Sequence, residues 1–313
     1  MPLPTDEKLL ALSNDLIQMF DQIFGLHPGF RPAHAKGLMF TGTFTPAPGA
    51  DSLTKAAHVT RPSTPVTVRF SNSTGVPIIP DTDPNANPRG FAVRFNLAEH
   101  VHTDIVSHST DGFPTRTGQE FLQFLQALAT SDLSNIPASP FGAFLASHPA
   151  ALAFVQAPKP FPVSFATDTY YAVTAFMFTN AAGKVTYGRY RIIPEAGNAY
   201  LDEATLATKG PNYHFEEIAE RVAKGPVNFK IVVQLAEDGD TVDDATIHWP
   251  ESRKLQELGT LTLTAPVADN DKEQKVIIFD PIPRLEGIGP SDDPLLELRA
   301  AIYLISGRRR RAA

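Results

Sequence analysis

Short extended segments separated by turn-forming residues are the feature that most limits how this chain can fold. Apolar or alternating segments, which are typical of strands, recur along the chain between Pro, Gly and Asn residues. The predicted strands are 38–44, 65–70, 90–97, 103–108, 172–179, 185–193, 228–235, 259–264 and 275–279. Many short strands joined in this way favour an antiparallel barrel or sheet.

Helical segments flank and interrupt these strands. An apolar stripe at three- and four-residue spacing predicts a helix over 6–24, with Thr5 as its N-cap and Gly25 at its end. An irregular, proline-containing arm follows at 27–36, and Thr117 is the predicted cap of a helix in the middle of the chain. Further helices are predicted at 141–154, 202–209, 215–224 and 294–305. We therefore expect an α+β protein, an antiparallel β-barrel with inserted helices and a C-terminal helix.

The length of 313 residues suits one large domain, and the chain contains no repeat or low-complexity linker. We expect a single domain over 1–313. Its parts are an N-terminal helix and arm at 1–36, a barrel with inserted helices at 37–280, and a C-terminal helical segment at 281–313.

Charge and cysteine content exclude several classes of function. The formal net charge of -7 argues against a broad nucleic-acid-binding surface, and the basic run 308–311 is expected to be a frayed, solvated end. The absence of cysteine excludes disulfides, thiolate metal sites, iron–sulfur clusters and thiol peroxidase chemistry. Any redox chemistry here therefore needs a cofactor.

The N-terminal sequence carries early acidic residues and no continuous apolar run, so it does not read as a secretory signal. No stretch has the apolar length of a membrane span. We expect a cytoplasmic protein without a membrane span.

Four segments contain residues suited to chemistry. They are Arg-Pro-Ala-His-Ala-Lys-Gly at 31–37, Val-Arg-Phe-Ser at 68–71, Asn-Pro-Arg-Gly-Phe at 87–91 with Thr-Asp-Ile-Val-Ser-His-Ser at 103–109, and a region from Phe-Asp-Pro at 279–281 to Arg-Ala-Ala-Ile-Tyr at 299–303. Each segment alone is ambiguous. Together, and in this order, they resemble the haem catalase family, especially the shortened catalase-related peroxidases. The resemblance covers about 30–130 and 275–305, and it implies a catalase-like barrel that binds haem b.

The resemblance assigns a role to each matching residue on the peroxide side of the haem. His34 matches the distal histidine, whose neutral imidazole can move a proton from one peroxide oxygen to the other. Ser71 matches the serine that holds the other nitrogen of this imidazole. Phe113 and Phe121 match aromatic residues of the distal pocket, and the second is expected to lie against the porphyrin.

On the opposite side of the haem, Tyr303 matches the proximal iron ligand, and tyrosine ligation is the known arrangement in catalases. Arg299 lies one helical turn earlier on the same face, where a guanidinium favours the charged phenolate. Asp293 matches an acid that pairs with this arginine. Arg31 and Arg69 match partners of the haem propionates, for which a planar guanidinium is well suited.

One residue departs from the family pattern. His108 stands where the family has the distal asparagine, and an imidazole is larger than an amide and can gain charge near neutral pH. The resemblance therefore implies a peroxidase with weak catalase activity. We expect the catalase activity to fall as the pH drops through the range where histidine gains its proton, which lies near ~6.5 for an unperturbed pKa.

The first functional hypothesis is a haem peroxidase that reduces hydrogen peroxide or organic hydroperoxides with a small organic reductant. A second is a haem enzyme that rearranges fatty-acid hydroperoxides, like the catalase-related allene oxide synthases. A third is a non-enzymatic haem carrier, although the pair of His34 and Ser71 argues against it because a carrier needs no proton shuttle. We expect no nicotinamide dinucleotide to bind, and a homodimer remains open.

Overall fold

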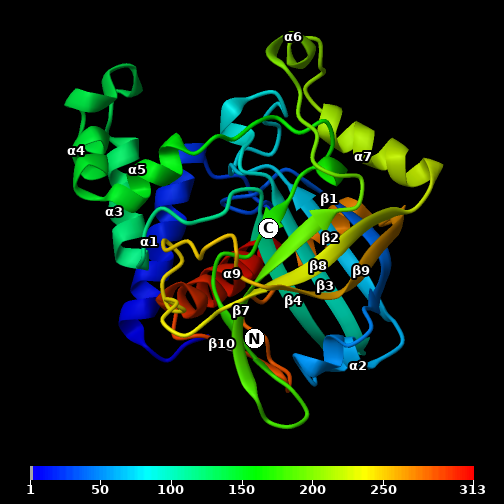
Figure 1. Ribbon diagram of the computed structural model, residues 1–313. Coiled ribbons are helices and arrows are strands. Elements are labelled where there is room, and N and C mark those ends of the chain that lie inside the picture. Colours follow the sequence, from blue (N-terminus) through cyan, green and yellow to red (C-terminus); the bar gives the residue numbers. More distant parts are fainter. Residues whose placement is uncertain (1–2) are drawn as a thin grey trace.

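The computed structural model describes residues 3–313 (Figure 1). Within these residues eight strands form a closed antiparallel ring, because β9 pairs with β8 on one side and with β1 on the other. The ring consists of β1 (Gly37–Pro46), β2 (Thr64–Ser71), β3 (Gly90–Ala98), β4 (Val101–His108), β5 (Tyr170–Tyr171), β7 (Val185–Pro194), β8 (Val227–Leu235) and β9 (Leu255–Pro266). The predicted antiparallel barrel is confirmed.

Two short strands extend the sheet beside the ring. They are β6 (Phe176–Thr179), which pairs with β7, and β10 (Ile288–Pro290), which pairs with β6. The predicted strand over 172–179 is therefore two strands, because residues 172–175 leave the ladder between β5 and β6. The segment 281–313, expected to be helical, also contributes β10.

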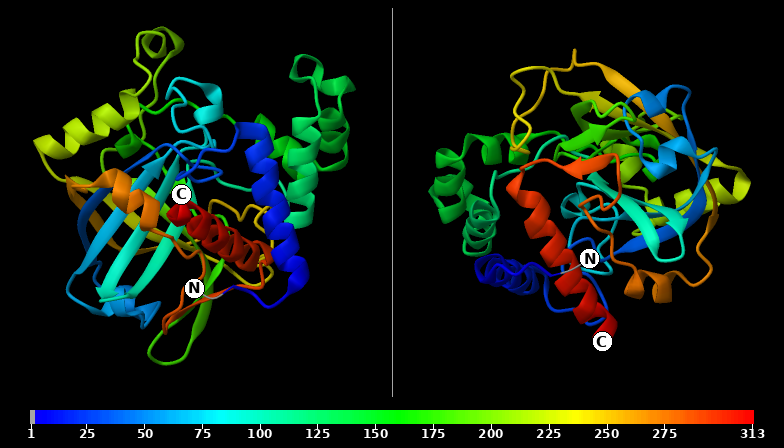
Figure 2. Two further views of the ribbon diagram at one scale, coloured as in Figure 1. Left: turned by 180° about the vertical axis from the view of Figure 1, so that it is seen from behind. Right: turned by 90° about the horizontal axis from the view of Figure 1, so that it is seen from below.

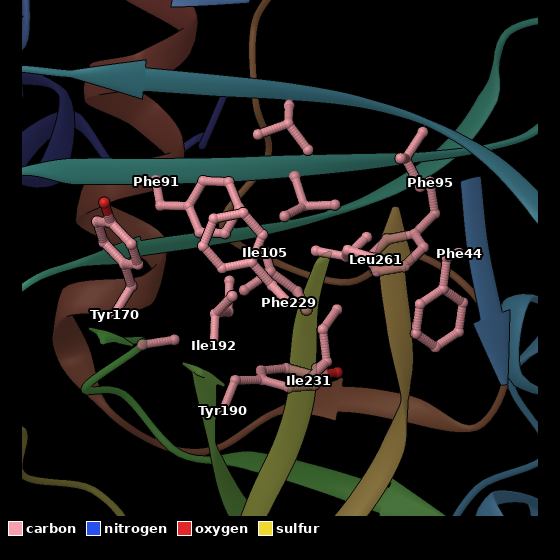
Figure 3. Close-up of a cluster of buried hydrophobic side chains, with 14 of the residues drawn as sticks. Phe44, Phe91, Phe95, Ile105, Tyr170, Tyr190, Ile192, Phe229, Ile231 and Leu261 are labelled. Atoms are coloured by element: carbon pink, nitrogen blue, oxygen red, sulfur yellow. The ribbon is translucent and has the colours of Figure 1, made fainter. Parts of the chain in front are cut away.

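Aromatic and aliphatic side chains fill the inside of the barrel. Phe91, Ile105 and Phe229 point towards one another from three different strands (Figure 3). The ring centroids of Phe91 and Phe229 are 4.9 Å apart, and Phe70 stacks on Phe91 at 4.6 Å. An eight-stranded barrel is only just wide enough for its own side chains. A large ligand must therefore bind outside the barrel.

The helices cover the outside of the barrel. Figure 2 shows the C-terminal helix α9 between the N-terminal helix α1 and the strands. The longer helices are α1 (Glu7–Phe24), α3 (Gly118–Ala129), α4 (Pro140–Ser147), α5 (Pro149–Gln156), α7 (Tyr213–Lys224) and α9 (Pro294–Ala312), and the short ones are α2 (Ala57–Thr60), α6 (Glu203–Leu206) and α8 (Asn270–Val276). In the described residues 3–313, none of these helices has both the length and the apolar character that a membrane span requires.

Local capping explains where the helices begin. Asp6, and not the predicted Thr5, caps α1, because its carboxylate accepts the N–H of Lys8 at 2.8 Å. The predicted end at Gly25 is confirmed. Thr117 caps α3 in a reciprocal capping box with Glu120, as predicted for this threonine.

Two expectations about the C-terminal region are wrong. Residues 275–279 are not a strand, because α8 extends to Val276 and a loop follows. The basic run 308–311 is not a frayed end, since α9 continues to Ala312 and the Arg310 side chain is buried. Both errors have the same physical cause: main-chain carbonyls of the 274–277 segment accept hydrogen bonds from Arg310 and Arg311, a partnership that exists only in the folded chain.

Candidate active site

Strand register brings the predicted distal residues together at one end of the barrel. Gly37 pairs with Ser71, Ser71 with Gly90, and Gly90 with His108. Successive side chains point to opposite faces of a strand, and Phe91 faces the interior. Ser71 and His108 therefore face outwards, side by side on one rim.

A cavity of about 260 Å³ lies between this outer face and α9. Ala92 and Val106 form its barrel wall, and Leu298 and Ile302 form part of its α9 wall. It is also lined by every predicted site residue except Asp293, namely Arg31, His34, Arg69, Ser71, His108, Phe113, Phe121, Arg299 and Tyr303. The fold thus brings residues from both ends of the chain into one site.

His34 is held in a specific neutral state. Its Nδ1 lies 3.1 Å from the Ser71 hydroxyl, and burial, followed by the charge of Arg69, lowers its pKa to about 3. Its backbone φ of 57° lies in the left-handed region, which non-glycine residues rarely adopt. The Ser73 carbonyl accepts the His34 N–H at 2.9 Å, and Arg69 donates to the His34 carbonyl at 2.8 Å. The imidazole is therefore uncharged and fixed in orientation.

Glycine at position 90 makes room for this pair. A Cβ placed on Gly90 would overlap the Ser71 hydroxyl and lie 2.8 Å from Nδ1 of His34, closer than real Cβ contacts allow. Any side chain here would displace the hydrogen bond between His34 and Ser71.

His108 is also a neutral imidazole, with its tautomer set by the backbone. The N–H of Thr110 donates to Nδ1 at 3.3 Å, so Nε2 carries the proton. Burial lowers the pKa of His108 to about 4, and Arg299 and Lys159 act in the same direction. The expected titration near ~6.5 is therefore wrong, because His108 stays uncharged across the neutral range. It is a neutral N–H donor, as an amide would be.

Helix α9 presents Arg299 and Tyr303 to the cavity from successive turns. Arg299 Nη2 donates to the Tyr303 oxygen at 3.3 Å, and the guanidinium carbon lies 5.7 Å from the phenol ring centroid. This arrangement can stabilise negative charge on the phenolic oxygen.

Asp293 has a different role from the one expected. It is the N-cap of α9, where one carboxylate oxygen accepts the N–H of Leu295 at 2.9 Å. The other oxygen has no hydrogen-bond partner among residues 3–313. The structure shows no ion pair between Asp293 and Arg299, although the charge of Arg299 opposes the rise that burial causes in the pKa of Asp293.

Three arginines face the same cavity: Arg69 and Arg310 are buried, and Arg31 is half-buried. Among the described residues their partners are neutral: Arg31 and Arg310 donate to main-chain carbonyls, and Arg69 also donates to the Gln274 amide oxygen at 2.7 Å. Burial and mutual repulsion lower the pKa of Arg69 to about 9. Burial also lowers the pKa of Arg310 to about 10. Buried guanidiniums without an acidic partner form a site for carboxylates or other anions.

Sequence reasoning missed Arg310. The signal that could have revealed it is spacing, since Arg310 lies seven residues after Tyr303, two turns further along the same helix face.

The cavity combines apolar walls, an anion-binding cluster, a phenol–guanidinium pair and two neutral imidazoles. In residues 3–313 no cluster of three or more His, Asp or Glu residues is arranged to hold a metal ion directly. These residues fit a flat, mostly apolar cofactor that carries carboxylates and its own metal.

Comparisons with known proteins agree with this description. The family described as Catalase matches residues 28–313. A catalase-related peroxidase of Mycolicibacterium paratuberculosis is 32% identical over 289 residues, which are 91% of this chain and 90% of the relative. A catalase-related peroxidase of Synechococcus elongatus is 29% identical over 301 residues, which are 95% of this chain and 88% of the relative.

Solved structures show the same fold. Catalase A from Saccharomyces cerevisiae superimposes with a TM-score of 0.80 at 21% identity, over 99% of this chain and 65% of the yeast chain. A bacterial catalase gives a TM-score of 0.77 at 23% identity, over 99% of this chain and 62% of the bacterial one. At these identities the likeness establishes the fold alone.

Proposed function

The chain belongs to the catalase family, and we propose that it is a haem-dependent peroxidase with weak catalase activity. In this proposal a small organic reductant reduces hydrogen peroxide or organic hydroperoxides, and residues 1–313 form one haem-binding domain. One observation carries the proposal: a single cavity joins the His34–Ser71 pair to the Arg299–Tyr303 pair, beside a cluster of arginines. The two relatives named catalase-related peroxidases, which match over most of their length, support it.

Haem b fits the residues that the cavity presents. Tyr303 would supply the iron ligand, and Arg31, Arg69 and Arg310 would bind the propionates. Phe121 and the apolar residues of α9 would pack against the porphyrin. When bound, haem would supply a redox-active iron for the reduction of peroxide.

His34 would act as the general acid–base group. Because its pKa is lowered to about 3, the ring is free to accept a proton from one peroxide oxygen and deliver it to the other. The hydrogen bond to Ser71 keeps the second ring nitrogen engaged, so a single nitrogen faces the peroxide. His108 would donate its Nε2–H to the same substrate.

Arg299 would stabilise the ligating phenolate of Tyr303. Its guanidinium already donates to the phenolic oxygen, and no acidic side chain forms an ion pair with it in residues 3–313. Its positive charge is therefore available to the phenolate.

The proposal of weak catalase activity rests on the size of His108. Catalase turnover requires a second peroxide to bind in the distal pocket, and an imidazole leaves less room than an amide. Peroxidase turnover needs only an electron from a reductant near the haem edge. The bulkier residue should limit the first reaction more than the second.

The test begins with the purified protein, its visible spectrum and its haem content. We expect about one haem b per chain, and Tyr303→Phe should abolish or greatly weaken its retention. Tyr200→Phe is the matched control, because Tyr200 is exposed and lies outside the cavity. Full haem occupancy with an unchanged spectrum in Tyr303→Phe would show that the ligand assignment is wrong.

Activity assays separate the peroxidase from the alternatives. Dye oxidation with hydrogen peroxide and with cumene hydroperoxide should be clearly measurable, and oxygen evolution should be weak. Rearrangement of a fatty-acid hydroperoxide without consumption of reductant would instead indicate an allene oxide synthase-like enzyme. Haem binding without any of these activities would indicate a carrier.

A further inference from the structure

Helix α1 precedes the segment 28–313 that the family model matches, and it contributes to the cavity wall. The family match begins at residue 28, whereas α1 covers Glu7–Phe24. Phe20 on α1 lines the cavity, and its ring centroid lies 6.2 Å from that of Phe121. Phe20 therefore makes α1 part of the cavity wall.

Of the helices that line the cavity, α1 buries the smallest share of its residues, although its apolar face packs against the cluster that includes α3 and α9 residues. Only Ser13, Leu16 and Ile17 of its eighteen residues are fully buried, whereas α9 buries nine residues. The strands of the barrel wall are held by continuous ladders of hydrogen bonds. Regions with few buried contacts open at lower free energy than regions with many. On this ground we expect α1 to be the wall that opens most easily.

The connection between α1 and the rest of the chain is suited to a hinge. The helix ends at Gly25 with φ 84°, and Gly29 has φ 82°, so two residues with left-handed backbone precede Arg31 and His34. A few residues that tolerate large backbone changes are sufficient for a hinge. Because both lie between α1 and Arg31, α1 can move without moving the distal histidine.

Besides this apolar packing, two close contacts join α1 to its neighbours. Arg309 on α9 forms a two-pronged ion pair with Asp21, with Nη2 and Oδ1 2.9 Å apart. Gly118, the first residue of α3, has no side chain, and a Cβ there would overlap Leu298 of α9 and lie 3.3 Å from Leu12 of α1. The three helices therefore meet closely at one glycine. The ion pair ties α1 to the same helix that carries Tyr303.

We propose that α1 is part of the haem-binding site and forms its movable wall. Phe20 contacts the haem, and the haem enters and leaves when α1 swings away from α9. This inference rests on the proposed haem binding, because without haem there is nothing for α1 to retain.

The absence of cysteine makes a direct test possible. The double variant Asp21→Cys/Arg309→Cys is loaded with haem and then treated with a short bismaleimide, which links α1 to α9. The matched control is the same protein treated with N-ethylmaleimide, which modifies both thiols without linking them. Haem loss is followed by transfer to excess apomyoglobin. We expect the linked protein to lose haem at least about tenfold more slowly than the control.

The outcomes distinguish this inference from the proposed function. Equal rates of haem loss in the linked and unlinked proteins would overturn the movable wall. A wild-type protein that holds no haem would overturn the proposed function itself.

Single substitutions keep the test independent of the double variant. Asp21→Asn should speed haem loss by about two- to fivefold, the range expected for a partly exposed ion pair. Asp15→Asn, an exposed position on the same helix, should leave the rate unchanged.

Phe20→Ala should also speed haem loss and alter the Soret circular dichroism. Phe24→Ala should spare the Soret signal, because Phe24 stacks on Phe20 but does not line the cavity. The inference would be contradicted if Asp21→Asn and Asp15→Asn lost haem at the same rate, or if Phe20→Ala and Phe24→Ala had the same Soret circular dichroism.

Discussion

Substitution of Gly90 by alanine tests whether the contact between His34 and Ser71 drives peroxide cleavage. The added Cβ would lie 2.8 Å from Nδ1 of His34, whereas ordinary Cβ contacts begin at 3.4 Å. The imidazole must therefore move by about 0.6 Å (3.4 minus 2.8) or lose its hydrogen bond. Because a misplacement of ~1 Å can cost ~10²-fold in rate, we expect Gly90→Ala to slow peroxide cleavage by about tenfold.

Gly188 supplies the matched control. It lies in β7 away from the cavity, and a Cβ there would overlap Val233 on β8. Both variants introduce one methyl group into a tightly packed strand, so each should lose about 1–3 kcal/mol of stability. Urea unfolding measures this loss. Comparing the two variants separates a general packing defect from a defect at His34.

The assay is stopped-flow mixing of the haem-loaded protein with hydrogen peroxide, followed at the Soret band. Gly90→Ala should be slow at full haem occupancy, and Gly188→Ala should match the wild type. If both variants lose stability equally and both keep the wild-type rate, the placement of His34 by Ser71 has no part in the reaction. Equal slowing in both would likewise refute the reasoning.

Three further predictions concern individual histidines. His34→Ala should slow peroxide cleavage by about 10²–10⁴-fold while haem remains bound, and a loss below roughly threefold in stopped-flow experiments would contradict its acid–base role. His108→Asn should raise the ratio of oxygen evolution to dye oxidation. Because the pKa of His108 is about 4, this ratio should be independent of pH around neutrality in the wild type, and a step near ~6.5 would show that the residue titrates normally. Burial lowers the pKa of His58 to about 3, so the unfolded chain binds the extra proton and stability falls as the pH drops from ~6.5 towards 3. His58→Leu should reduce this pH dependence by up to ~1.4 kcal/mol per pH unit in urea unfolding, and an unchanged slope would exclude His58 as a contributor.

The sequence alone predicted the parts of the fold that depend on local pattern. Alternating apolar residues located most barrel strands, including 90–97 and 228–235, to within two residues, because side-chain alternation is set by the backbone itself. The exceptions are β9, which begins four residues before the predicted 259, and β5, which precedes the predicted strand at 172–179. The cap at Thr117 was also predictable, because its partner Glu120 is only three residues away in the sequence. The spaced motifs also named ten site residues, of which nine line one cavity in the folded chain and one, Asp293, does not.

Features that depend on partners distant in sequence appeared only in the tertiary structure. The basic run at 308–311 is helical and partly buried because Asp21 and the 274–277 carbonyls accept its hydrogen bonds. The same hydrogen bonds fix the predicted strand at 275–279 as the end of α8 and the loop that follows it. No local pattern contains these partners, so the segments were misread.

The charge states of the histidines also depend on partners distant in sequence. His108 looks like an ordinary titrating imidazole in the sequence, and only burial beside Arg299 and Lys159 keeps it neutral. Helix α1 was predicted as a helix, but its place against α9 makes Phe20 a wall of the cavity. Sequence spacing therefore determined which residues could react. Burial and long-range packing decided their protonation, their partners and the wall that encloses them, because these depend on what surrounds a group in space.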